Sequence, residues 1–150
     1  MRDVGLQCTR SKELWQKETP MKQFKTISPI GDGDTNAVPV KDIGPAIGFY
    51  TRMLGFSVVT KDEKSAVLKR DDVQVGLVSK QGHDPKRAGS FYFDVVDVEA
   101  LRREFQGKGG KPGAIELQEY EGKNYRLFFL RECDMMASHD GYCFCFGQPA

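Results

Sequence analysis

The stretch VPVKDIGPAIGFYTRMLGF, from Val38 to Phe56, decides the fold of this chain. It opens with β-forming residues, turns at Asp42, and continues with apolar residues at helical spacing. The apolar positions are Ile43, Ile47, Tyr50 and Leu54, which Phe49 and Met53 broaden into one face. Asp42 is a good N-cap, and Gly55 is suited to the left-handed conformation that ends a helix. The stretch therefore predicts a strand, an amphipathic helix and a second strand.

A fainter copy of this pattern, FDVVDVEALRREFQGKGGKPG, occurs later in the chain. Asp97 stands in the copy where Asp42 stands in the first stretch, and Gly110 stands where Gly55 does. Both pairs are separated by the same 55 residues. A repeated strand-helix-strand opening at one fixed offset predicts two similar modules within one domain.

The domain is expected to span residues 24–147, after an N-terminal extension of residues 1–23 that includes a short helix within Lys12–Glu18. Module one covers about residues 24–81 and module two about residues 90–147, with the polar loop GHDPKRAG between them. The expected strands are Phe24–Ile30, Ala37–Val40, Phe56–Thr60, Ser65–Lys69, Val73–Ser79, Ser90–Val96, Ala114–Leu117, Tyr125–Leu130 and Gly141–Phe146. Pro39 indicates an edge or bulged strand, because proline cannot donate a ladder hydrogen bond.

Composition narrows the class of protein. The chain has 150 residues, 39% of them hydrophobic and 29% charged, which is typical of one globular domain. A net charge of +1 favours neither nucleic acid nor an anionic membrane as partner. No apolar run approaches the roughly 20 residues that span a bilayer, and no secretory signal opens the chain. The four cysteines are irregularly spaced, so we expect reduced thiols and a cytoplasmic location.

The strand-Asp-helix opening followed by FYTRMLGF resembles the vicinal oxygen chelate superfamily, which includes glyoxalase I, bleomycin-resistance proteins and extradiol dioxygenases. The resemblance covers about residues 24–147 and rests on Val38, Val40, Asp42, Phe49, Tyr50 and Leu54–Gly55–Phe56. It implies an α+β fold in which two βαβββ modules enclose a cleft between curved, mostly antiparallel sheets, with the helices outside. It also implies a homodimer. The late His139–Asp140–Gly141 is similar to that family's DPDG turn, although Ser138–His139 stands in place of Asp-Pro.

In the metal-using members, His, Gln or Glu side chains on the first and last strands of both modules point into the cleft. Those positions fall near Thr35, Gly76, Ser90 and Cys145 in this chain. A one-residue slip in alignment gives Asn36, Val75 or Leu77, Phe91, and Phe144 or Phe146 instead. None of these residues is a histidine or a carboxylate, the ligands such a site needs. We therefore expect neither a divalent metal nor another cofactor.

Alternation along strands predicts which side chains face the cleft. On Ser90–Val96 these are Ser90, Tyr92 and Asp94, while Phe91, Phe93 and Val95 face the helices. Cys143 and Cys145 share the cleft face, and Phe144 and Phe146 face the helices. Arg126 and Phe128 are also placed toward the cleft, with Arg126 as the structural partner of Asp94. The expected ligand-binding residues are thus Val78, Ser90, Tyr92, Asp94, Arg126, Phe128, Cys143 and Cys145.

Two alternative roles exist for some of these residues: binding of a soft metal by the cysteines, and a charged or catalytic role for Asp94. Cys143, Cys145 and His139 would supply only three ligands to a soft metal, so small apolar fillers are the favoured interpretation of both cysteines. Asp94 would serve a cationic ligand group or act as a base, but a structural partnership with Arg126, or a position at the solvent-exposed end of the sheet, is the favoured interpretation.

The favoured function is a metal-independent small-molecule-binding protein that resembles the bleomycin-resistance branch. The alternative is a glyoxalase, isomerase or dioxygenase-type metalloenzyme with displaced ligands. A third hypothesis is a non-catalytic interaction module that acts through its N-terminal arm.

Overall fold

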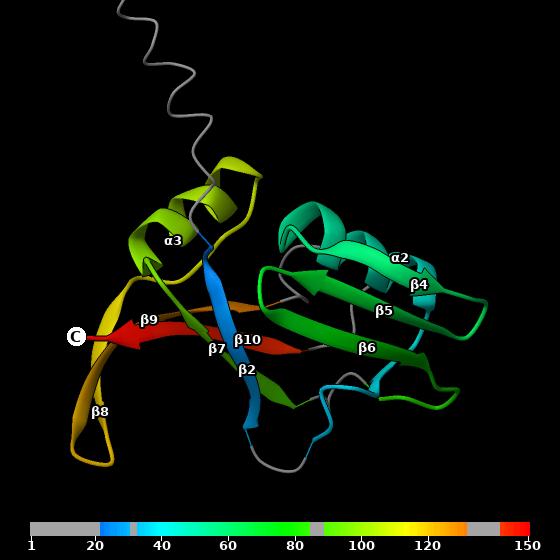
Figure 1. Cartoon of the computed structure of the whole chain (residues 1–150), viewed down its shortest axis with the longest axis horizontal. Coiled ribbons are helices and arrows are strands. Elements are labelled where there is room, and N and C mark those ends of the chain that lie inside the picture. The colour runs from blue at the N-terminus through cyan, green and yellow to red at the C-terminus, as the bar shows by residue number, and fades with distance from the viewer. Residues whose placement is uncertain (1–21, 31–32, 85–88, 132–141) are drawn as a thin grey trace, which may run out of the picture.

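The computed structural model describes residues 22–30, 33–84, 89–131 and 142–150. The expected helix within Lys12–Glu18, most of the N-terminal extension and the turn at His139 lie outside these ranges. Among the described residues, no helix combines the length and the apolar character that crossing a bilayer requires. Figure 1 shows two β-sheets side by side, with a helix above each.

The elements of the two sheets follow the chain in order. The four-stranded sheet contains β3 (Val38–Val40), β4 (Ser57–Lys61), β5 (Ser65–Arg70) and β6 (Val73–Ser79). The five-stranded sheet contains β2 (Phe24–Ile30), β7 (Ser90–Val95), β8 (Glu116–Tyr120), β9 (Lys123–Arg131) and β10 (Cys143–Pro149). The helices are α2 (Ile43–Gly48), which continues as the π-helical turn η1 (Phe49–Met53), and α3 (Val98–Gly107).

The two modules have the same topology. The strand orders are β3-β6-β5-β4 and β2-β7-β10-β9-β8, so the second sheet repeats the first and adds β2 at its edge. In each module the first strand is parallel to the last, β3 to β6 and β7 to β10. The other pairs are antiparallel. The predicted α+β fold with two βαβββ modules is confirmed.

One strand lies in a different sheet from the one predicted. Strand β2 was expected to belong to module one, but it pairs antiparallel with β7, with Ser28 opposite Tyr92 and Ile30 opposite Ser90. Strand β3 supplies the first strand of module one, at the edge that Pro39 indicated. Local sequence shows that β2 is a strand, but the sheet edge it joins is set by contacts far away in the chain.

The helix boundaries follow the predicted caps closely. Gly55 takes the positive φ of +78° expected of a left-handed cap. Asp97 caps α3 by accepting a hydrogen bond from the backbone N–H of Ala100 at 3.1 Å. Asp42 occupies the corresponding N-cap position without a side-chain hydrogen bond. After α3 the positive φ falls on Gly109, at +90°, one residue before the predicted Gly110.

Both modules share one hydrophobic core beneath the helices. The ring of Phe24 on β2 is 5.6 Å from Phe56 of module one and 5.2 Å from Phe93 of module two. Phe49 on η1 stacks on Phe144 of β10 at 5.7 Å. Each aromatic pair adds about 0.5–1.5 kcal/mol to the burial of its rings. The modules are therefore joined by packing as well as by the chain.

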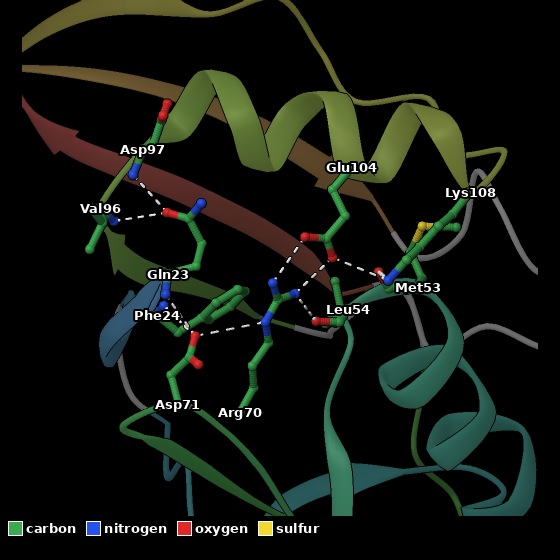
Figure 2. A network of polar contacts seen from close by, with 10 residues as sticks. All are labelled: Gln23, Phe24, Met53, Leu54, Arg70, Asp71, Val96, Asp97, Glu104 and Lys108. Carbon is green, nitrogen blue, oxygen red and sulfur yellow. Dashed lines mark hydrogen bonds and ion pairs between the residues drawn. The ribbon is translucent and has the colours of Figure 1, made fainter. Parts of the chain in front are cut away.

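A polar network also joins the modules (Figure 2). Arg70, at the end of β5, makes two 2.9 Å hydrogen bonds to the carboxylate of Glu104 on α3. The same guanidinium donates to the carbonyl of Leu54 at 2.7 Å, and Lys108 donates to Glu104 and to the carbonyl of Met53. The network thus satisfies carbonyls at the end of η1 while it holds α3 against module one.

The start of β2 is held by two further side chains in Figure 2. Asp71 accepts hydrogen bonds from the backbone N–H groups of Gln23 and Phe24 at 2.8 and 2.9 Å. The side-chain oxygen of Gln23 accepts from the backbone N–H groups of Val96 and Asp97. The strand is therefore anchored to the β5–β6 turn of one module and to the start of α3 in the other.

Candidate ligand-binding pocket

A cavity with a volume of about 550 Å³ lies on the five-stranded sheet. Every strand of that sheet contributes to its wall. The lining residues are Ser28, Pro29, Ile30, Tyr92, Gln118, Tyr120, Tyr125, Leu127, Phe129 and Cys145. Its size and its aromatic lining with a few polar groups are typical of small-molecule sites.

Strand register explains why these side chains meet. Ser28 lies opposite Tyr92, Tyr92 opposite Cys145, and Cys145 opposite Phe129, so the four form one row across β2, β7, β10 and β9. Residues at matched positions of neighbouring strands point to the same face of a sheet. The row faces away from the core, where the intervening Phe91, Phe93, Phe144 and Phe146 are buried.

The hydroxyl of Tyr92 has an unusual environment. It is the one buried side-chain nitrogen or oxygen atom in the described part of the chain that has no hydrogen-bond partner. It lies over Gly147 of β10, where a Cβ atom would be only 2.7 Å from it. Burial raises the pKa of the Tyr92 hydroxyl, and the negative charge of Asp94 raises it further. The hydroxyl therefore stays protonated and is a potential donor.

Cys145 lies in the wall of the pocket as a free thiol that is 3% exposed. Burial raises the pKa of its thiol to about 12, and its neighbours Cys143 and Glu116 act in the same direction. A protonated, buried thiol is not an activated nucleophile. In this setting Cys145 serves as a small apolar side chain, in line with the interpretation drawn from the sequence.

Of the eight expected ligand-binding residues, Tyr92 and Cys145 line the pocket. Ser90 and Cys143 are register partners and are half-buried near it. Asp94 lies 3.9 Å from the amine of Lys25, so its ion pair is made with β2 rather than with Arg126. Val78 lies in the other sheet and is 37% exposed.

The orientation predicted for Arg126 and Phe128 was wrong. Phe128 is fully buried in the core, 5.2 Å from Phe146 and 6.1 Å from Phe105 of α3. Arg126 shares that face and forms an ion pair with Glu99 of α3. Both faces of β9 carry large apolar side chains, so alternation alone could not tell which face was buried.

The pocket includes residues that the sequence did not single out. Tyr125, Leu127 and Phe129 follow from the corrected orientation of β9, and Gln118 lies opposite Tyr125 on β8. The β2 residues of the pocket could not be found because that strand was assigned to the other module. Tyr120, 66% exposed at the rim, has no sequence signal beyond its alternation with Gln118.

The positions of the superfamily's metal ligands do not fit a divalent ion here. A side chain at Gly76 would begin 2.1 Å from the backbone oxygen of Asn36, because residues 35–36 lie across β6 at this point. Neither Ser90 nor the protonated Cys145 provides the carboxylate or imidazole such a site requires. No group of three or more His, Cys, Asp or Glu residues in the described ranges is arranged to hold a metal ion.

Comparison with solved structures finds the same fold. A bleomycin-binding protein complexed with bleomycin superimposes with a TM-score of 0.62 and 24% sequence identity, covering 78% of this chain and 98% of that one. A bleomycin resistance determinant encoded on the transposon Tn5 gives 0.61 and 24%, with coverages of 78% and 97%. The bleomycin-binding protein of Streptomyces verticillus, complexed with copper(II)-bleomycin, gives 0.55 and 20%, with coverages of 79% and 97%.

Comparison of sequences points the same way. The model of the Glyoxalase/Bleomycin resistance protein/Dioxygenase superfamily matches residues 33–146. No curated protein sequence is significantly similar to the chain. The matched range includes both modules and starts after β2.

Proposed function

The chain belongs to the Glyoxalase/Bleomycin resistance protein/Dioxygenase superfamily, and from this premise we propose that it binds a small organic molecule without a metal. The observation that carries the proposal is the 550 Å³ pocket with its wall of tyrosine and phenylalanine rings. These rings offer large, rigid contact area at low entropic cost. Because the superfamily contains diverse chemistries, membership alone would not choose among them.

The donor set supports binding rather than metal-assisted catalysis. Metal-assisted chemistry requires ligands that leave open coordination positions for the substrate. The wall of the pocket holds instead aromatic rings, a neutral thiol and the polar side chains of Ser28 and Gln118. We therefore place the ligand against the five-stranded sheet, with Tyr92 and Cys145 at the centre of the contact.

Bleomycin, with which two of the structural relatives are complexed, is the first ligand to test. Protein dialysed against a chelator is titrated with metal-free and with copper(II)-bleomycin in a calorimeter, beside a thermal-shift panel of aromatic metabolites. A ligand at about one hundred times its Kd should stabilise the protein by about 2.7 kcal/mol. Replacement of Phe129 by alanine should weaken binding, because its ring lies in the wall.

Two outcomes would contradict this function. Binding or turnover that appears only after a divalent metal is restored would favour the metalloenzyme alternative, as would stoichiometric metal in protein purified without chelators. Saturable binding that is unchanged when Phe129 is replaced would place the ligand elsewhere on the protein.

We also propose that the protein is a homodimer whose partner covers the open side of the pocket. Ile30 on β2 and Tyr120 on β8 lie at opposite edges of the pocket, and they are 52% and 66% exposed. Burial of such side chains is favourable at about 25 cal/mol per Å². Native mass spectrometry should detect a dimer that Ile30→Asp weakens together with ligand binding. A monomer that retains full ligand affinity would contradict this.

The cytoplasmic location remains a prediction. It rests on the irregular spacing of the four cysteines, which we expect to be reduced thiols, and is tested by localising the tagged protein in cells.

A further inference from the structure

The search for a further role begins with the hydroxyl of Tyr92, because buried polar groups in folded proteins almost always have partners. Its oxygen is buried, has no hydrogen-bond partner and belongs to a side chain that lines the pocket. A buried hydroxyl without a partner costs free energy relative to a phenylalanine of the same shape. For folding alone, phenylalanine would serve better at this position.

The surrounding residues leave room for the hydroxyl without satisfying it. The ring reaches across β10 at Gly147, where any side chain would collide with both the hydroxyl oxygen and the ring carbon Cε1. The same side chain on Gly147 would also meet the Cβ atom of Leu127 on β9, at 3.2 Å. Because no hydrogen bond holds the hydroxyl there, turning the side chain toward the pocket breaks none.

We propose that Tyr92 is the specificity-determining donor of the pocket, and that its hydroxyl turns to bind a hydrogen-bond acceptor on an uncharged, planar ligand group. This inference rests on the proposed function and deepens it by naming the ligand class. The acceptor on the ligand would satisfy a hydroxyl that the protein itself leaves without a partner, and this hydrogen bond would contribute to the free energy of binding.

The lack of charge in the ligand group follows from the wall of the pocket. None of its ten described lining residues is Asp, Glu, Lys, Arg or His. An ionised group placed there would lose hydration without forming an ion pair with any of these lining residues. Planarity follows from the rings of Tyr92, Tyr120, Tyr125 and Phe129, which offer their faces for stacking.

Two probes of nearly equal shape isolate the proposed hydrogen bond. Naphthalene and quinoline are both flat and bicyclic, and quinoline adds one ring nitrogen that accepts a hydrogen bond. At mildly alkaline pH both are uncharged. Wild-type protein should bind quinoline about three to ten times more tightly than naphthalene, the range expected of one neutral hydrogen bond.

Tyr92→Phe should abolish this preference and leave the affinity for naphthalene unchanged. The variant without ligand should be as stable as the wild type or more stable, because it loses a hydroxyl that has no partner. Tyr142→Phe is the matched control: it removes a hydroxyl that donates to the carbonyl of Pro39 at 2.7 Å outside the pocket, so it should lower stability and leave the preference intact.

Several results would overturn the inference. A preference for quinoline that survives in Tyr92→Phe would show that another group binds the nitrogen. Equal loss of both probes, with a fall in stability, would show that Tyr92 is only structural. Equal binding of both probes to the wild type, or binding of neither, would reject the ligand class. The proposed function would still stand or fall on the bleomycin and metabolite titrations.

Discussion

At the scale of single residues, the carboxylate of Glu104 connects helix α3 to Arg70 of module one. It is 31% exposed and accepts both forks of the Arg70 guanidinium as well as the amine of Lys108. Burial is the largest influence and acts to raise the pKa of Glu104, but the hydrogen bonds and charges of Arg70 and Lys108 together outweigh it and lower that pKa. The ionised form is therefore favoured by folding.

Glu104→Gln should lower the free energy of unfolding by about 1–2 kcal/mol at neutral pH, since charge-assisted hydrogen bonds are lost from a partly exposed site. A lowered folded-state pKa gives stability that is present above the unfolded value of 4.5 and is lost as the pH falls through the folded value. Urea unfolding of both proteins should therefore give free energies that converge in acid. A difference that does not change with pH would contradict this.

Glu99→Gln provides the matched control. Its ion pair with Arg126 also joins α3 to a neighbouring element, but the two side chains are 52% and 37% exposed. Exposed pairs contribute little because water screens them, so the variant should lie within about 0.5 kcal/mol of the wild type.

At the scale of elements, strand β9 shows where sequence patterns stop being informative. Strand β7 alternates between phenylalanine or valine and more polar residues, and its predicted orientation was correct. In β9 the run Leu127–Leu130 is apolar on both faces, because one face packs in the core and the other lines the pocket. A strand that packs in the core on one side and lines a pocket on the other has apolar residues on both faces, so it lacks the apolar–polar alternation from which the orientation of a strand is predicted.

Adjacent phenylalanines of β9 test its orientation. Phe128→Ala should lower the free energy of unfolding by about 3–5 kcal/mol, because a fully buried ring leaves a cavity. Phe129→Ala should lower it by about 1–2 kcal/mol, since the half-buried ring lies in the pocket wall. Urea unfolding measures both. Equal losses, or a larger loss at Phe129, would mean that the strand faces the other way.

Strand β6 carries a glycine where the superfamily's metal-using members place a ligand. The backbone N–H of Gly76 donates to the carbonyl of Thr35 at 2.9 Å, so the chain lies directly on the strand. The sequence predicted that this position could not ligate, since it is a glycine. It did not reveal that the backbone of Asn36 fills the space.

Gly76→Ala should therefore lower the free energy of unfolding by about 2–3 kcal/mol, because the new Cβ collides with backbone that has no other place to go. Gly44→Ala, in the first turn of α2, is the control: apart from its chain neighbours and the adjacent helix backbone, no described atom lies within 4 Å of its Cβ. That variant should be neutral or more stable by up to about 1 kcal/mol. Thermal unfolding of both variants measures the two changes in stability. A Gly76→Ala variant as stable as the wild type would contradict the close approach of the Asn36 backbone to Gly76.

At the scale of the whole molecule, the duplication was predictable and the union of its two halves was not. The 55-residue offset of Asp42 and Asp97 predicts two modules of one topology. How the two modules are joined depends on β2. This strand precedes module one in the sequence but pairs with β7 of module two. Such non-local pairing carries no periodic signal, so the pocket residues that β2 supplies were missed as well.

Phe24 packs against both modules. It is fully buried, its ring contacts Phe56 of one module and Phe93 and Phe146 of the other, and the Arg70 guanidinium lies 4.6 Å from its centroid. Phe24→Ala should therefore cost about 3–5 kcal/mol and destabilise both modules together. Unfolding followed by far-UV and near-UV circular dichroism should keep coincident midpoints, displaced by the same amount. Midpoints that separate in the variant would show that the two modules have independent cores.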